Sequence, residues 1–137
     1  MDLQNTFENG RKLVEDFLSG NKHYFSTLKP SDIPDKLPGI YAIFTATETL
    51  YVGRTTNLRR RLYTNHLMGP IANARLKKYL IEDETCFPNI TGPAEAKLYL
   101  KDHCYVQFIS VDTVIERGKI EGLLSYALNV KYLYEEH

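Results

Sequence analysis

The sequence predicts an α/β fold, with a small three-stranded antiparallel sheet flanked by helices and an extra helix at the N-terminus. Two short apolar segments rich in strand-forming residues, 40–44 and 50–52, are separated by a polar turn, which is typical of a β-hairpin. A third such segment lies at 105–109, and segments with helical spacing precede, separate and follow the strands. This order favours one layered domain.

The first part of the chain predicts a helix that ends at Ser19-Gly20, because apolar residues recur at helical spacing. These residues are Leu3, Phe7, Leu13, Val14, Phe17 and Leu18. A second short helix is expected at 23–28, and the prolines at 30, 34 and 38 indicate a connector. We therefore expect an N-terminal helical extension and linker over 1–37, packed as an accessory layer, and the main domain over 38–137.

After the hairpin, turn and cap residues alternate with apolar runs. Thr55-Thr56-Asn57 offers N-caps for a helix. The expected helices cover 58–66, 71–81 and 94–100, and a long final helix covers 115–132. Its apolar side carries Ile120, Leu123, Leu124, Ala127 and Leu128.

Composition narrows the class of protein. The chain has 137 residues, of which 43% are hydrophobic and 25% charged, as in a globular domain. Its 17 basic and 17 acidic residues cancel, so net charge gives no support to nucleic-acid binding. Cys86 and Cys104 form no CxxC pair, which predicts two free thiols and no zinc site. Neither a signal peptide nor a membrane span is recognisable, so we expect a cytoplasmic protein without a membrane partner.

The segment from Gly39 to Arg61 concentrates the chemistry. Tyr41 and Tyr51 lie in paired strands and should share one face of the sheet. Four arginines follow within eight residues, and arginine forks match phosphate oxygens; they are Arg54, Arg59, Arg60 and Arg61. Taken separately, buried tyrosines usually serve packing, and arginines on a helix usually form a solvated face.

The joint pattern resembles the GIY-YIG nuclease family. Gly39-Ile40-Tyr41 and Tyr51-Val52-Gly53 match its two triplets, and Arg61 follows Gly53 by eight residues, as the family's helix arginine does. The resemblance covers roughly 38–134 and extends to small stand-alone bacterial members. It implies a nuclease with the fold described above.

The resemblance also implies a metal-holding glutamate on a later helix, for which Glu116 and Glu121 are candidates. We favour Glu121, because it borders the core, whereas the helix dipole already explains Glu116. Many relatives have a histidine four residues after the arginine, but that position is Asn65 here. His66 comes one residue later, a rotation of about 100° on an α-helix. Leu133 stands where relatives often have asparagine, and the nearest substitute is Asn129, expected on the last helix.

The implied reaction is hydrolysis of a phosphodiester with one Mg²⁺ or Mn²⁺ ion held by Glu121 and water. Tyr41 would act as general base, Arg61 would hold the phosphate, and Tyr51 would position water or phosphate. Arg54, Arg59 and Arg60 would bind the nucleic-acid backbone. DNA is the favoured substrate over RNA, and the N-terminal helix could mediate a homodimer.

The alternative is a catalytically inactive module of the same fold that binds nucleic acid or a protein partner. Convergence of the tyrosines, Arg61 and Glu121 on one patch would favour the nuclease. A Glu121 carboxylate that points away would favour the module.

Overall fold

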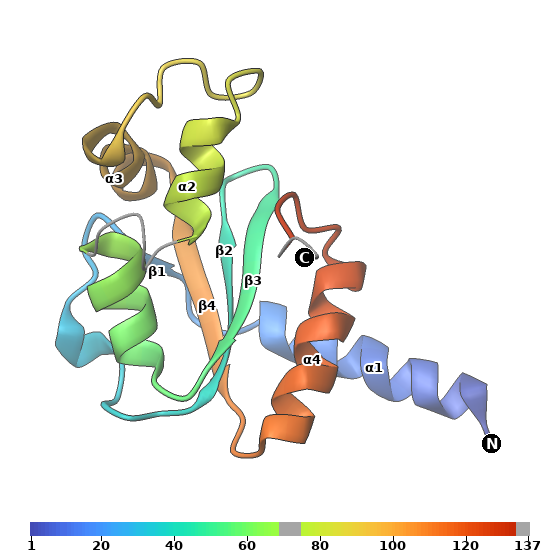
Figure 1. Ribbon diagram of the computed structural model, residues 1–137. Coiled ribbons are helices and arrows are strands. Elements are labelled where there is room, and N and C mark those ends of the chain that lie inside the picture. The colour runs from blue at the N-terminus through green and yellow to red at the C-terminus, as the bar shows by residue number, and fades with distance from the viewer. Residues whose placement is uncertain (69–74, 134–137) are drawn as a thin grey trace.

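The computed structural model describes residues 1–68 and 75–133 and forms a sheet with helices on both faces (Figure 1). Its elements, in chain order, are α1 (Leu3–Leu18), β1 (His23–Tyr24), η1 (Pro30–Asp32), β2 (Gly39–Phe44), β3 (Thr49–Thr55), η2 (Arg60–Leu67), α2 (Arg75–Glu82), α3 (Pro93–His103), β4 (Tyr105–Ser110) and α4 (Val114–Ala127). The α/β class, the antiparallel hairpin and the third strand are confirmed.

The sheet has four strands in the order β1-β4-β2-β3, so the prediction of three strands is wrong. The extra strand, β1, lies where we expected a short helix at 23–28. His23 and Tyr24 pair with β4, and the ring of His23 stacks on Phe108 at 5.1 Å. The amide of Phe25 also donates to the carbonyl of Cys104. Pairing with a distant strand thus overrides the local pattern.

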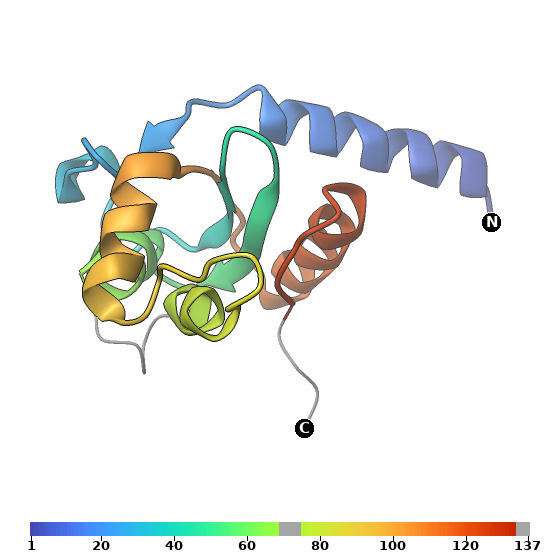
Figure 2. The same ribbon diagram turned by 90° about the horizontal axis from the view of Figure 1, so that it is seen from above.

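Both faces of the central strand β2 are buried, which explains its continuous apolar sequence. Tyr41 and Ile43 point into the core formed with η2, α2 and α3. Ile40, Ala42 and Phe44 point into the opposite core, which α1 and α4 close. Figure 2 shows these two helices together on one side of the sheet.

Helix α1 has the predicted bounds, and its last turn buries Phe17 in the core beneath α4. The start of α1 extends past the rest of the molecule in Figure 2 and leaves Leu3 and Phe7 exposed. The division into 1–37 and 38–137 stays a prediction. Across residues 1–68 and 75–133, no helix has the length and apolar character needed to cross a membrane. Both cysteines are free, as predicted.

The last helix ends earlier than predicted, since α4 stops at Ala127 instead of continuing to Tyr132. Asn129 adopts a positive φ of 49°, which turns the chain back toward the sheet. The amides of Lys131 and Tyr132 then donate to the carbonyls of Thr49 and Leu50, at 2.9 and 3.0 Å. We call residues 128–133 the C-terminal strap. For the helix predicted at 71–81, residues 71–74 lie outside the described residues.

Candidate active site

The hairpin places the two motif tyrosines on one face of the sheet. Tyr41 pairs with Gly53, and Ile43 pairs with Tyr51, so the tyrosines are diagonal neighbours. Their ring centroids are 6.2 Å apart. The predicted shared face is therefore present.

Steric overlap explains why both motif positions carry glycine. A Cβ on Gly53 would overlap the hydroxyl of Tyr41, and a Cβ on Gly39 would overlap the carbonyl oxygen of Ile109 on β4. Gly53 thus leaves the space that the phenol of Tyr41 fills, while Gly39 lets β2 and β4 pair closely.

The helix after the hairpin is a π-helix over most of its length, η2. A bond from the amide of Met68 to the carbonyl of Tyr63, at 3.1 Å, shows the five-residue spacing. Residues five apart therefore lie on the same side of η2, as residues four apart do on an α-helix. The rotation of about 100° expected for an α-helix is absent, and Arg61 and His66 share one side.

His66 reaches the core and contacts the first motif tyrosine. The residue is 1% exposed, and its Nε2 lies 2.7 Å from the hydroxyl oxygen of Tyr41. Burial, followed by the charges of Arg61 and Lys77, lowers the pKa of His66 to about 3. The ring is therefore neutral at pH 7, and its tautomer decides which group donates. Within the described residues, Nδ1 has no hydrogen-bond partner.

The charged residues predicted for the site act on both phenols. Burial raises the pKa of Tyr41 well above its ordinary value, and burial also raises that of Tyr51. The charge of Arg61 opposes each rise, while that of Glu121 adds to it. Arg61 and Glu121 are thus close enough for their charges to act on the tyrosine pair. Burial nevertheless outweighs the help from positive charge that a tyrosine base would need.

Glu121 is half-buried on α4, and its carboxylate points back toward β3, where Arg54 Nε lies 3.8 Å away. Burial raises the pKa of Glu121, and Arg54 partly offsets this rise. Gly118 makes room for the arginine, since a Cβ there would stand 2.8 Å from Nη1 of Arg54. Glu116 is exposed and pairs with Lys119 at 3.8 Å. The geometry favours Glu121 over Glu116.

A comparison with protein-family models matches residues 37–91 to the GIY-YIG catalytic domain. This match spans both triplets, Arg61 and His66. The chain carries a GIY-YIG domain. A search of curated proteins and a search of solved structures found no match. The match ends before Glu121, so the place of this carboxylate in the GIY-YIG site rests on the geometry of α4.

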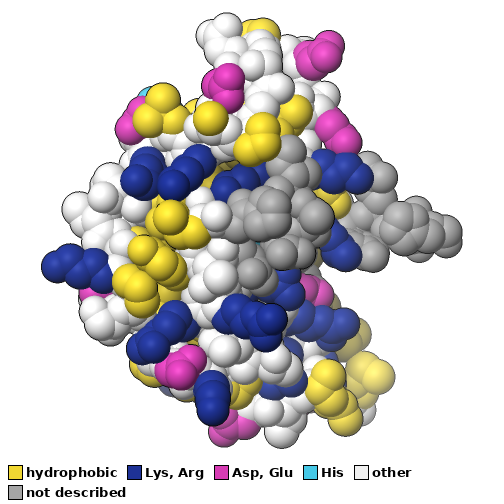
Figure 3. Space-filling model, turned by 60° about the vertical axis from the view of Figure 1, so that its left-hand side comes forward, with side chains coloured by type: hydrophobic (Ala, Val, Ile, Leu, Met, Phe, Trp, Pro, Cys, Tyr) yellow, Lys and Arg dark blue, Asp and Glu magenta, His cyan; other side chains and the backbone are white. Residues whose placement is uncertain are grey.

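The three other predicted arginines occupy two different settings. Arg60 is exposed, as is Arg54, whereas Arg59 is half-buried and donates from Nε to the carbonyl of Ile33 at 2.7 Å. Figure 3 shows Lys and Arg side chains spread over one face of the molecule, with acidic side chains mainly at its top and bottom. This face supplies positive charge that the neutral total conceals.

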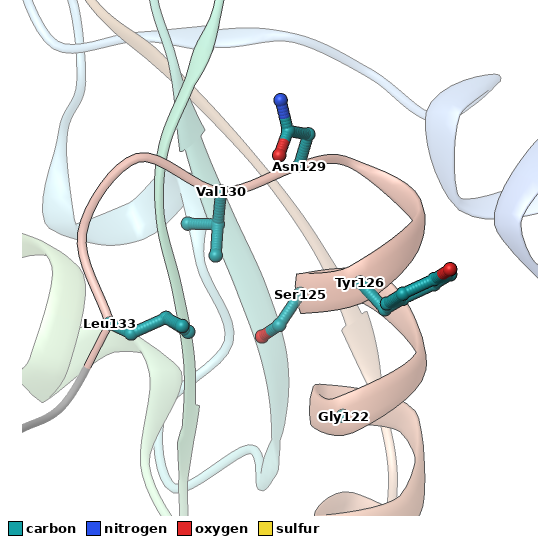
Figure 4. Close-up of a pocket in the computed structure, with 6 residues that line it drawn as sticks. All are labelled: Gly122, Ser125, Tyr126, Asn129, Val130 and Leu133. Carbon is teal, nitrogen blue, oxygen red and sulfur yellow. The ribbon is translucent and has the colours of Figure 1, made fainter. Parts of the chain in front are cut away.

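Asn129 lies after α4 and not on it, which corrects the prediction. It lines a cavity of about 650 Å³ together with Gly122, Ser125, Tyr126, Val130 and Leu133 (Figure 4). None of Tyr41, Tyr51, Arg61, His66 and Glu121 lines this cavity. Asn129 is therefore not among the residues that the structure brings together.

Two residues near the GIY-YIG site were not predicted. The charge of Arg75, at the start of α2, acts on both tyrosines and lowers the pKa of each. Lys77 is buried and acts on His66. A lysine in a helix is ordinarily exposed, so the sequence offered no signal for Lys77.

Proposed function

We propose that this chain is a divalent-metal-dependent endonuclease that hydrolyses phosphodiester bonds in nucleic acid, DNA more readily than RNA. The observation that carries the proposal is the hydrogen bond between Tyr41 and His66, beside the charges of Arg61 and Glu121. Strands β2 and β3, the π-helix η2 and α4 all contribute to this one place.

Tyr41 is proposed as the general base, and His66 is proposed to accept the proton of the Tyr41 hydroxyl. A buried phenol with a raised pKa keeps its proton at rest. In the tautomer protonated at Nδ1, Nε2 of His66 accepts that proton across 2.7 Å. Tyr41 then takes a proton from the attacking water as its own proton passes to His66, whose lowered pKa the negative charge of a bound phosphate would raise. Arg61 holds the phosphate and stabilises its negative charge, and Tyr51 positions water or phosphate.

Glu121 is proposed to hold the divalent ion. No group of three or more His, Cys, Asp or Glu side chains suited to a metal occurs in the described parts of the chain. One carboxylate and several waters still suit Mg²⁺, which retains much of its hydration. A half-buried carboxylate with a raised pKa gains from a nearby cation, so the residue fits. A bound ion would lower the pKa of its water and polarise the phosphate.

The nucleic-acid backbone is proposed to run over Arg54 and Arg60, with Arg59 at the margin. Arg54 follows Gly53 on β3 and pairs with Glu121, and Arg59 and Arg60 directly precede Arg61. Binding that depends on a few phosphate contacts weakens as salt increases. We expect little sequence specificity, because the site offers few contacts to base edges.

The test is cleavage of DNA and RNA of matched sequence with Mg²⁺ or Mn²⁺. Glu121→Ala and Tyr41→Phe should abolish cleavage, as should a chelator. Two matched controls should cut normally: Glu116→Ala removes an exposed carboxylate from the same helix, and Tyr126→Phe removes an exposed phenol. Metal-dependent cutting that survives in both site variants would show that the assignment of these residues is wrong.

An inactive nucleic-acid-binding module is the second candidate, and the burial of the phenols favours it. Tyr41 is 2% exposed and Tyr51 is 9% exposed, so the arginines and Glu121 form the outer part of the site. A module would bind nucleic acid in a salt-dependent way through Arg54 and Arg60. If the chain is such a module, the wild type and Tyr41→Phe would bind nucleic acid equally well, and neither would cleave it.

A further inference from the structure

Lys77 is buried in a place where a lysine is costly. The residue is 2% exposed, on the side of α2 that faces the core beneath the sheet. Lysine is almost never fully buried without polar partners, because its ammonium loses hydration. Burial, followed by the charge of Lys97, lowers the pKa of Lys77. This cost needs a structural reason.

The ammonium of Lys77 binds the end of the π-helix. Its Nζ donates to the carbonyl oxygen of Leu67 at 2.8 Å, and Leu67 is the last residue of η2. The final carbonyls of a helix have no partner within the helix, and a cation is favourable there. Lys77 thus ties α2 to the end of η2, one residue beyond His66.

His66 has little else to orient its ring. A histidine in an active site is usually oriented by a hydrogen bond at its second ring nitrogen. Here Nδ1 has no partner among the described residues. The ring is held by the bond to Tyr41 and by contacts with the rings of Tyr41 and Tyr51, at 5.3 and 5.6 Å. Its position must therefore come largely from the backbone that carries it.

We propose that Lys77 is a positioning residue for the reaction, which fixes the end of η2 so that the imidazole of His66 meets the hydroxyl of Tyr41. The proposal rests on the proposed endonuclease function for its effect on rate. Its structural part stands apart from activity, because it concerns only the contact between His66 and Tyr41.

The charge of Lys77 supports the same role. Within residues 1–68 and 75–133, four titratable or charged groups bear on His66: Tyr41 from β2, Tyr51 from β3, Arg61 within η2 and Lys77 from α2. Lys77 and Arg61 both disfavour the imidazolium. Lys77 therefore holds the ring in place and also keeps it neutral, so that Nε2 can accept the hydrogen bond from the Tyr41 hydroxyl.

The experiment compares Lys77→Met with Lys77→Arg and Lys78→Met. Methionine keeps the length of the side chain without a donor or charge, and arginine keeps both. Lys78→Met removes the same charge from the next residue of α2, which is exposed and pairs with Glu82 at 4.0 Å. For Lys77→Met we expect kcat for DNA cleavage to fall about 100-fold with little change in KM, as for a displaced catalytic group. Lys77→Arg should restore much of the rate, and Lys78→Met should match wild type.

The second readout is the NMR titration of the His66 ring nitrogens. Lys77→Met should raise the pKa of His66 and shift its ring resonances, while Lys78→Met should leave both unchanged. If Lys77→Met fails to fold, the wild type decides: the His66 resonances should move as Lys77 itself titrates at high pH. Equal His66 spectra in Lys77→Met and Lys78→Met, or flat resonances in the wild type, would overturn the proposal. A wild type that never cleaves nucleic acid would instead overturn the proposed function, and the NMR test of the contact between His66 and Tyr41 would stay valid.

Discussion

Acid should destabilise this protein through His66. The pKa of the folded-state ring is lowered from 6.5 to about 3, first because the ring is buried. Above pH 6.5 the ring is neutral in both the folded and the unfolded chain, so the shift has no effect. Below pH 6.5 the His66 ring gains a proton in the unfolded chain but stays neutral in the folded chain. The free energy of unfolding therefore falls as pH drops from about 6.5 toward 3.

The size of the loss follows from the shift. One group contributes at most about 1.4 kcal/mol per pH unit. Between pH 6.5 and pH 4 the loss should thus reach about 3 kcal/mol, a large part of a typical stability of about 5–15 kcal/mol. The matched variant is His66→Gln, which does not titrate and keeps an amide able to bond to the Tyr41 hydroxyl. Other groups titrate alike in both proteins, so the difference between them isolates His66.

The assay is urea unfolding of wild type and His66→Gln at pH 7, 6, 5 and 4, followed by circular dichroism. The wild type should lose stability relative to the variant at each step below pH 6. A difference that stays constant from pH 7 to pH 4 would refute the reasoning. So would an NMR titration in which folded His66 gains its proton near pH 6.5.

Two further predictions concern the stability of the folded chain. Gly53→Ala should cost about 1–3 kcal/mol in thermal or urea unfolding and also impair cleavage, because its methyl group overlaps the Tyr41 hydroxyl. Gly122→Ala is the control: among the described residues, no atom beyond its chain neighbours and its own helix backbone lies within 4 Å of the new Cβ, so this exposed helix position should gain about 0.5–1 kcal/mol. Tyr132→Phe removes the bond to Asp83, at 2.6 Å, and should cost about 1.5–3 kcal/mol. Faster hydrogen exchange of the strap amides should accompany that loss, and unchanged exchange would contradict it.

Features with a strong local pattern were predicted well from the sequence. The hairpin follows from two runs of strand-forming residues and a polar turn, and α1 follows from its apolar spacing and its Ser19-Gly20 end. The shared face of Tyr41 and Tyr51 follows from the two-residue period of a strand. Each of these rests on residues that are close in the sequence, so tertiary packing had little to change.

Features that depend on distant partners were missed. Strand β1 forms only because β4 offers an edge to His23 and Tyr24. The strap leaves the helical path because Asn129 turns and the following amides bond to β3. In both segments the local residues tolerate a helix, and backbone partners far along the chain decide the outcome. The burial of Lys77 was missed for a related reason, since its ammonium bonds to the end of another helix and not to a residue of α2.

His66 shows that the residue spacing in a motif has meaning only together with the type of helix that carries the residues. A histidine five residues after Arg61 would miss the site on an α-helix, yet on η2 it bonds to Tyr41. The apolar residues of η2 carry the same period, because Leu62 and Leu67 are both buried and also lie five apart. One wide turn thus serves the core and the site together. His66 therefore reaches Tyr41 although Asn65 stands at the position where the resemblance implies a histidine.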